Sequence, residues 1–187
     1  MTQLGFVFHG ERCTGCGACI IACKEEKNLP DGVWLRTRKE NPHDWVFLTQ
    51  PCNHCDKPAC MAICPVKAYH KEENGLVIQD HSKCIGCRAC IGACPWHVPS
   101  YSKDEKKVYK CDGCIARLNR GEKPACLEAC PAQAIEFGDI SELRKKYPDA
   151  VVEGAAWAKA EFGYPDPKRT GANIVICLLY TSPSPRD

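Results

Sequence analysis

The sequence predicts an α+β fold of two similar modules, each built from small antiparallel sheets and short helices. Three observations lead to this prediction. Residues 5–23 and 75–94 form an internal repeat, with one residue inserted in the second copy. Sixteen of the 17 cysteines in the 187-residue chain fall into four compact groups. The 14 glycines and 14 prolines indicate many turns, so the elements between them must be short.

Local signals place the elements along the chain. Each copy of the repeat has the pattern of a short strand, a cysteine-containing loop and a helical turn. Gly15 and Gly86 lie inside these loops, where backbone N–H groups must approach bound sulfur and a side chain would crowd them. Asp139 is expected to cap a helix that runs to about Tyr147. The remaining expected elements are strands at 33–38, 45–49 and 134–137, hairpins at 68–80 (turning at 73–75) and 100–110, and an extended segment beyond Pro148.

The cysteine spacing indicates the chemistry. The first and third groups read C-x2-C-x2-C-x3-C, the spacing of the bacterial ferredoxin ligand run. The second and fourth keep the opening C-x2-C and the closing C-x3-C, but the gap between these pairs is four and eleven residues. The groups are Cys13, Cys16, Cys19 and Cys23; Cys52, Cys55, Cys60 and Cys64; Cys84, Cys87, Cys90 and Cys94; and Cys111, Cys114, Cys126 and Cys130.

Three interpretations of these cysteines compete. Disulfides would require a secreted protein, and repeated C-x2-C pairs are poor long-range cross-links. Zinc knuckles use two C-x2-C pairs separated by a spacer of ordinary residues, whereas a third cysteine follows directly in the first and third groups. A cubane iron–sulfur cluster takes four thiolates. The sequence therefore favours four [4Fe-4S] clusters with all sixteen cysteines as iron ligands, and a zinc-binding interaction protein is the alternative from a different class.

Three groups end in Cys-Pro, and this ending has a structural meaning. In two-cluster ferredoxins the first three cysteines of a run hold one cubane, and the fourth ligates the other. A short helix spans the gap between the third and fourth ligands, and a proline ends it by fixing φ. Pro65, Pro95 and Pro131 are placed to do this, whereas Lys24 follows the first group. These features predict two ferredoxin-like modules.

Charge and length restrict the function classes. The formal charge is +2, and four oxidised clusters at about −2 each would bring the loaded protein to roughly −6. We therefore interpret the Lys and Arg residues as partial compensation for cluster charge and expect no nucleic-acid partner. The longest apolar run near the C-terminus, Ile174 to Tyr180, is too short to span a membrane. The first ligand follows Met1 by twelve residues, which leaves no room for an export signal, so we expect cluster insertion in the reducing cytoplasm.

Some residues near the ligands need separate interpretation. His54 and His97 are expected at the surface or packed near a cluster, because sixteen thiolates already suffice. Trp96 is expected either to pack over a cluster and exclude water or to fill a gap or contact a partner. Lys110 and Arg88 flank ligands and are expected to be solvated, with tuning of a cluster potential by their charge as the alternative. No catalytic constellation is present, so the chain is expected to carry electrons and to transform no substrate itself.

Several segments together resemble the four-cluster electron-transfer subunit of the dimethyl sulfoxide reductase family. The resemblance runs from about residue 4 to 176 and is specific for the family but not for its substrate. The segments that carry it, besides the cysteine groups, are 52–60, 110–114, 121–126, 134–139 and 142–146.

The resemblance implies a place in a larger complex. Such subunits relay electrons between an integral-membrane anchor that oxidises quinol and a molybdopterin catalytic subunit. The chain would be peripheral to the cytoplasmic membrane, on the outer (periplasmic) face after co-export with a partner, or alternatively cytoplasmic. A polyferredoxin-type subunit of a cytoplasmic formate dehydrogenase or hydrogenase is the other functional interpretation.

The resemblance also implies how the groups pair, first with fourth and second with third. The implied quartets are Cys13, Cys16, Cys19 and Cys130; Cys111, Cys114, Cys126 and Cys23; Cys52, Cys55, Cys60 and Cys94; and Cys84, Cys87, Cys90 and Cys64. Some relatives lack the second ligand of the third group and hold a three-iron cluster, but here that ligand is Cys87. The first module is expected at 1–50 and 105–147, the second at 51–104, and the extended segment at 148–176. Residues 177–187 depart from the family pattern and are expected to be a non-native or disordered tail, with Cys177 outside the ligand set.

Overall fold

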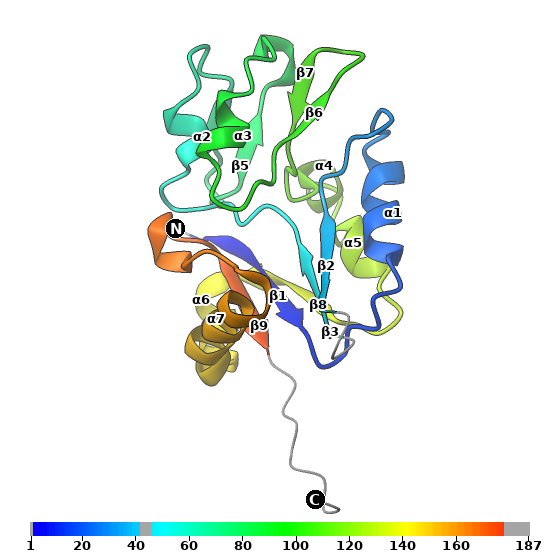
Figure 1. Ribbon diagram of the computed structural model, residues 1–187, viewed down its shortest axis with the longest axis vertical. Helices are drawn as coiled ribbons and strands as arrows, with labels where there is room; N and C mark the ends of the chain where they lie inside the picture. Colours follow the sequence, from blue (N-terminus) through cyan, green and yellow to red (C-terminus); the bar gives the residue numbers. More distant parts are fainter. Residues whose placement is uncertain (1, 42–45, 178–187) are drawn as a thin grey trace, which may run out of the picture.

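The computed structural model describes residues 2–41 and 46–177 and confirms the α+β class (Figure 1). A three-stranded sheet in the order β8-β1-β9 forms one end of the molecule. Strand β1 pairs antiparallel with β8 and parallel with β9. The expected strands at the start of the repeat and at 134–137 are thus confirmed, and β9 is an addition. The three strands are β1 (Leu4–His9), β8 (Ile135–Asp139) and β9 (Ile174–Cys177).

Both faces of this sheet are buried because apolar residues occupy both alternating sets of β1 positions. Phe6 and Phe8 face the main core, which also contains seven of the grouped cysteines. Val7 points the other way and packs with Ile140 and Leu143 of helix α6 (Ile140–Lys146). The sheet therefore separates the cysteine-rich core from the C-terminal helices, which Figure 1 shows beside it.

Three two-stranded hairpins complete the strands. Their bounds are β2 (Thr37–Asn41) with β3 (Val46–Gln50), β4 (Tyr69–Lys71) with β5 (Val77–Gln79), and β6 (Ser100–Ser102) with β7 (Lys107–Tyr109). The two expected hairpins are confirmed, and Gly75 takes a φ of +79° in the first turn. The strand expected at 33–38 begins only at Thr37, because residues 35–36 form a bend. The strand expected at 45–49 is confirmed as β3, but Trp45 lies outside the described residues.

Four helices begin at the alanine that precedes the third cysteine of each group. They are α1 (Ala18–Glu26), α2 (Ala59–Ala62), α3 (Ala89–Ala93) and α5 (Ala125–Glu128); α4 (Ile115–Leu118) follows Cys114. Helices α2, α3 and α5 end before the Cys-Pro pairs, as predicted. Helix α1 continues past Cys23, because Lys24 stands where the other groups have proline.

The prediction of an extended segment at 148–176 is wrong. Helix α7 (Pro148–Phe162) follows α6, whose expected cap is confirmed by hydrogen bonds from the Ser141 and Glu142 N–H groups to Asp139. The sequence of α7 is alanine-rich, Pro148 occupies its first turn, and Gly163 ends it with a φ of +62°, all favourable for a helix. Two short 3-10 helices are η1 (His81–Lys83) and η2 (Pro167–Arg169).

Two expected boundaries also change. Hairpin β6–β7 crosses the expected division between residues 104 and 105, and β7 packs with the second module: Gln79 Nε2 donates to Val108 O at 2.7 Å. Cys177, expected in the tail, ends strand β9 and is buried; residues 178–187 lie outside the described part. Over the described ranges, no helix combines the length and apolar character needed to cross a membrane.

Candidate metal centres

Four cavities are each lined by four cysteines. They are numbered 1 to 4 by the cysteine group that opens them: the first group opens cavity 1, the fourth cavity 2, the second cavity 3 and the third cavity 4. The sulfur atoms surround a space and do not meet at a point: among the residues that the structure describes, no three His, Cys, Asp or Glu side chains could hold a single metal ion. The quartets are Cys13, Cys16, Cys19 and Cys130 (cavity 1); Cys23, Cys111, Cys114 and Cys126 (cavity 2); Cys52, Cys55, Cys60 and Cys94 (cavity 3); and Cys64, Cys84, Cys87 and Cys90 (cavity 4). These are the same quartets that the family resemblance implies.

Short helices connect the cavities in pairs. Helix α1 carries Cys19 of cavity 1 and Cys23 of cavity 2, and α5 packs beside α1 with Cys126 of cavity 2. Helices α2 and α3 pack together in the same way between cavities 3 and 4. In Figure 1, α1 and α5 lie together along one side, whereas α2 and α3 lie together at the opposite end from the three-stranded sheet. Each pair of cavities therefore shares two helices.

Crossed contacts join cavity 2 to cavity 3. Lys110, next to Cys111 of cavity 2, points its Nζ to 3.7 Å from Cys52 Sγ of cavity 3. His54, inside the loop of cavity 3, places its Nε2 4.0 Å from Cys111 Sγ. Both side chains are buried. The four cavities consequently form one series, in the order 1, 2, 3, 4.

The backbone of each cysteine loop is turned by a residue in the left-handed region. Gly15 and Gly86 have φ values of +69° and +68°, which glycine adopts without strain. Protein atoms also crowd both positions: a Cβ on Gly86 would lie 1.9 Å from Lys106 O, and one on Gly15 would lie 2.6 Å from the Phe47 ring. His54 takes the same position in the second group with a φ of +42°.

The Cys-Pro endings aim backbone donors at sulfur. The Ala68 N–H donates to Cys64 Sγ and the Ala134 N–H donates to Cys130 Sγ, both at 3.3 Å. In each case the preceding residue, Lys67 or Gln133, has a φ of +49°, which turns the next N–H back toward the cysteine. Such N–H···S contacts stabilise a negatively charged thiolate.

Comparisons with known proteins bear on which kind of metal centre the cavities hold. Two family models match, the 4Fe-4S dicluster domain at residues 43–140 and the 4Fe-4S binding domain at residues 10–26. The B subunit of anaerobic dimethyl sulfoxide reductase from Escherichia coli (strain K12) is 41% identical, with 94% of this chain and 88% of that protein covered. The protein belongs to the iron–sulfur electron-transfer subunits of the dimethyl sulfoxide reductase family. These matches favour iron–sulfur clusters over zinc.

Two other members of this group show its breadth. Thiosulfate reductase electron transfer subunit PhsB of Salmonella typhi is 36% identical over 76% of this chain and 79% of that protein. The nitrate-inducible formate dehydrogenase iron-sulfur subunit of Escherichia coli (strain K12) is 30% identical over 92% of this chain and 67% of that protein. The family is thus shared by subunits of enzymes with different substrates.

In this family member, solvent exposure differs between the ends and the middle of the series. Cys16 of cavity 1 and Cys87 of cavity 4 are exposed. All four cysteines of cavity 2 and three of the four in cavity 3 are buried. Burial raises the pKa of the Cys23 thiol to about 12 and that of the Cys60 thiol to about 12. The cavity walls therefore favour neutral thiols, and thiolates there require a compensating positive charge such as bound iron.

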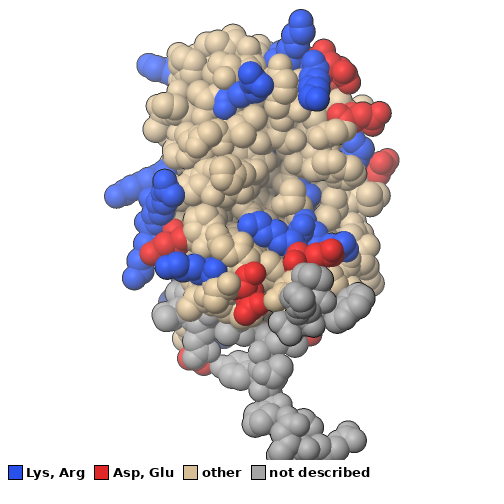
Figure 2. Space-filling model, viewed as in Figure 1, with Lys and Arg blue, Asp and Glu red and all other residues tan. Residues whose placement is uncertain are grey.

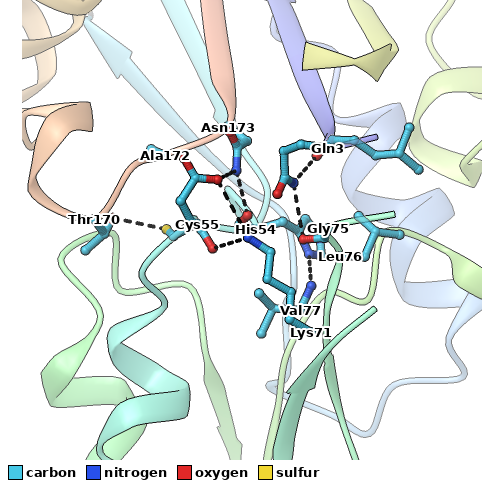
Figure 3. A network of polar contacts seen from close by, with 12 residues as sticks. Gln3, His54, Cys55, Lys71, Gly75, Leu76, Val77, Thr170, Ala172 and Asn173 are labelled. Atoms are coloured by element: carbon cyan, nitrogen blue, oxygen red, sulfur yellow. Dashed lines mark hydrogen bonds and ion pairs between the residues drawn. The ribbon is translucent and has the colours of Figure 1, made fainter. Parts of the chain in front are cut away.

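A C-terminal strap, residues 163–173, places Thr170 and Asn173 against the cysteine loop of cavity 3 (Figure 3). The Thr170 hydroxyl donates to Cys55 Sγ at 3.1 Å and accepts from Trp96 Nε1 at 3.3 Å. Asn173 Nδ2 donates to His54 O at 2.8 Å. Tyr164, fully buried, stacks against Trp96 with ring centroids 4.7 Å apart. The strap thus shields the cavity from water on this side.

The structure resolves the alternatives for several flanking residues. His54 is buried and accepts a hydrogen bond at Nδ1 from the Val77 N–H at 3.0 Å, so the packed position is correct and the surface position is wrong. His97 and Arg88 are exposed, as expected. Trp96 lines cavity 3. Lys110, expected to be solvated, is 7% exposed and donates to Val77 O and Cys111 O, each at 2.5 Å.

Sequence reasoning missed two residues that contact the cavities. Thr170 lies in the segment expected to be extended, and no cysteine motif is near it in the chain. Arg36 falls in the strand expected at 33–38, where regular alternation would turn Val33 and Leu35 inward and Arg36 outward. The bend at residues 35–36 buries both Leu35 and Arg36.

Proposed function

We propose that the chain holds four [4Fe-4S] clusters, one in each cavity, with the sixteen grouped cysteines as ligands, and conducts electrons through them. Four thiolates per cavity are the donor set that a cubane takes. Buried nitrogen atoms around the cavities also suit negatively charged sulfur: Lys110 Nζ lies near Cys52, and Arg36 Nε and Nη2 have no hydrogen-bond partner within the described ranges. When bound, each cluster supplies a one-electron redox centre.

The observation that carries this proposal is the linear series of cavities with exposed ends and a buried middle. Helices α1 and α5 bridge cavities 1 and 2, helices α2 and α3 bridge cavities 3 and 4, and Lys110 and His54 bridge the middle pair. A chain that accepts electrons at one surface and delivers them at another requires accessible terminal sites. The protein's own residues exclude water between those sites, which protects the intermediate centres from side reactions.

The partners follow from the family. We propose that a quinol-oxidising integral-membrane anchor and a molybdopterin catalytic subunit bind opposite ends of the series, and that this chain transforms no substrate itself. The first-and-fourth-group module would face the catalytic subunit and the other module the anchor. The exposed Ile63 and Ile85, next to cysteines of cavity 4 and 50% and 63% exposed, are suited to an apolar contact with a partner.

The proposed location is peripheral to the cytoplasmic membrane, on its outer face after co-export with a partner. Figure 2 shows Lys and Arg side chains mostly around the rim of one face, with a broad uncharged area between them. Such a surface is compatible with burial against partner subunits. Cross-linking of the assembled complex tests the orientation, and contacts between the cavity 4 end and the pterin subunit would overturn it.

The first experiment measures the centres themselves. Anaerobically purified protein should contain about 16 iron and 16 acid-labile sulfide per chain, because four cubanes each hold four of both. A reductive titration followed by low-temperature EPR should show several reduced centres with interacting spectra. Zinc without labile sulfide, or iron for only two clusters, would contradict the four-cluster proposal.

A second candidate function is an electron-transfer subunit of a formate dehydrogenase. It is favoured by the match to the nitrate-inducible formate dehydrogenase iron-sulfur subunit, which covers 92% of this chain at 30% identity. Purification of the complex and assay with a quinol analogue separates the two candidates. Oxidation of the reduced centres by dimethyl sulfoxide supports the first, whereas their reduction by formate supports the second.

A further inference from the structure

A buried guanidinium lies between cavities 1 and 2. Arg36 is 2% exposed and lines cavity 2. Its Nη1 donates to Thr49 Oγ1 at 2.7 Å, and Thr49 lines cavity 1. Its Cζ lies 5.5 Å from the Phe6 ring centroid. Arg36 therefore contacts the walls of both cavities in the first-and-fourth-group module.

Arg36 has unused hydrogen-bonding capacity. Its Nε and Nη2 atoms are buried and lack a partner in the part of the chain that the structure describes. No carboxylate in the described ranges pairs with it, whereas Arg117, a half-buried arginine of the same module, pairs with Glu26 at 2.9 Å. An unpaired buried cation is strongly destabilising, so a fold that retains one requires a negative partner. The cysteine quartets of cavities 1 and 2 are the nearest candidates for that partner.

We propose that Arg36 is a positioning residue that raises the reduction potentials of the clusters in cavities 1 and 2. Its side chain lines cavity 2 and keeps two buried nitrogens without a partner in the described ranges, and its positive charge acts on both cavities. This inference rests on the proposed four-cluster function. One-electron reduction, with the electron supplied by the donor side of the complex and passed on to the acceptor side, adds one negative charge to a centre. A nearby fixed cation in a region of low dielectric constant favours that reduced form.

A purely structural role makes a different prediction. If Arg36 only filled space and bonded Thr49, its replacement would change stability and leave the midpoint potentials unchanged. Arg38 is a suitable control, because it lies two residues further along the same segment. Its side chain is 36% exposed and pairs with Glu40 at 3.0 Å, and it also donates to Gly15 O. Arg38 carries the same charge near cavity 1, but in contact with water.

The experiment compares Arg36→Met, Arg36→Lys and Arg38→Met in the assembled, cluster-loaded complex by potentiometric EPR titration. For Arg36→Met, we expect two of the four midpoint potentials to fall by an amount equivalent to a tenfold change in the reduced-to-oxidised ratio, about 59 mV for one electron. Arg36→Lys keeps a charge but loses the planar fork, so we expect a smaller fall. Arg38→Met should lower the potentials less than Arg36→Met does, because water screens its charge.

The outcomes separate the possible failures. Unchanged potentials in both Arg36 variants, with full iron content, would overturn the inference. If Arg36→Met loses iron, Arg36→Gln decides the matter, because glutamine keeps hydrogen-bonding groups without the charge, and wild-type potentials in that variant would overturn the inference. An equal fall in Arg38→Met would show that the effect is not specific to the buried site and would also overturn it. Fewer than four centres in the wild-type protein would instead contradict the proposed function.

Discussion

Hydrogen bonds to individual sulfur atoms can set the reduction potentials of the proposed redox centres. Cys64 and Cys130 each accept a backbone N–H, which no side-chain substitution can remove. Cys55 instead accepts from the Thr170 hydroxyl at 3.1 Å. Because a donor to a cluster ligand favours the more negative reduced state, this hydroxyl is a side-chain contribution to the potential in cavity 3.

Thr170→Val tests this contribution with almost no change of shape. We expect the midpoint potential of one centre to fall by roughly 20–60 mV, the equivalent of a net hydrogen bond of about 0.5–1.5 kcal/mol. Potentiometric EPR titration of the loaded protein measures the shift. Thr170→Ser keeps the hydroxyl and should retain the wild-type potential. A shift of the same size in both variants would assign the effect to altered packing around residue 170 and not to the hydroxyl.

Glu136 is a second residue with several partners. Its carboxylate accepts from His9 Nε2 at 2.7 Å, pairs with Lys146 Nζ at 2.8 Å and accepts from the Tyr147 hydroxyl. Burial alone would raise its pKa, but these partners together lower it to about 2. A carboxyl group with a lowered pKa in the folded state stabilises that state above its ordinary pKa, and this stabilisation is lost as the pH falls toward 2.

At pH 7 the contribution of Glu136 is therefore fully present. We expect Glu136→Gln to lower the free energy of unfolding by about 1–2 kcal/mol at pH 7, after allowance for solvent screening of a partly exposed group. Anaerobic thermal unfolding followed by circular dichroism measures the difference as an apparent Tm. Glu142→Gln is the matched control, since Glu142 is 69% exposed and pairs only with Lys145. Equal Tm values for the two variants would contradict the prediction.

At the scale of elements, helix α7 packs on strand β9 through a glycine. Glycine in a helix interior is normally unfavourable relative to alanine by about 1 kcal/mol. Here, however, a Cβ on Gly154 would lie 1.6 Å from Ile176 O. Since that oxygen belongs to the backbone of β9, helix and strand would have to separate to accept a methyl group. At this position, the low helix propensity of glycine is offset by the close approach of helix α7 to strand β9.

Gly154→Ala is accordingly expected to destabilise the protein by about 1–3 kcal/mol, opposite in sign to helix propensity. Thermal or denaturant unfolding of the cluster-loaded protein measures this change in the free energy of unfolding. Ala156, on the exposed side of the same helix, supplies the control: Ala156→Gly should cost about 1 kcal/mol through propensity alone. Stabilisation by Gly154→Ala would show that α7 is not packed on β9 in this way.

Sequence predicted the elements whose signals are local. The two hairpins, the helices at the third cysteines and the cap at Asp139 depend on residues next to one another, and so do the turns that Cys-Pro produces. Helix α7 was missed although its alanines, Pro148 and Gly163 are local helix signals. Strand β9 was missed because its apolar residues become informative only once β1 provides a partner strand. Thr170 was missed for the same reason, since its partner Cys55 lies 115 residues away in the chain.

The cysteine quartets show the opposite situation. Pairing of the first group with the fourth came from family resemblance and not from spacing, because spacing cannot show which run supplies a fourth ligand. Neither cysteine spacing nor family resemblance indicated Arg36. Alternation along an assumed strand places it outward, and only the bend at residues 35–36 turns it into the interior. Departures from regular structure next to a site are therefore where sequence reasoning failed in this chain.

At the scale of the whole molecule, the cysteines are part of the hydrophobic core. The main cluster of buried residues includes Cys19, Cys23, Cys94 and Cys126, whereas a smaller cluster around β4, β5 and β7 contains Tyr69, Val77 and Val108 besides Cys90. In contrast, the cluster between the three-stranded sheet and α6 contains none of the sixteen grouped cysteines. The two ends of the molecule should therefore depend on bound clusters to different degrees.

Removal of the clusters is expected to unfold most of the chain. Without iron, the cavities would place buried polar thiols around empty space, and the few apolar contacts of the second module cannot offset its conformational entropy. Far-UV circular dichroism before and after oxidation and chelation should show loss of most of the signal. Hydrogen exchange sharpens the test, because peptides from 51–104 should lose protection completely while those from 135–177 retain part of theirs. An unchanged spectrum would contradict the prediction, and equal protection at both ends would show that the sheet and α6 have no stability of their own.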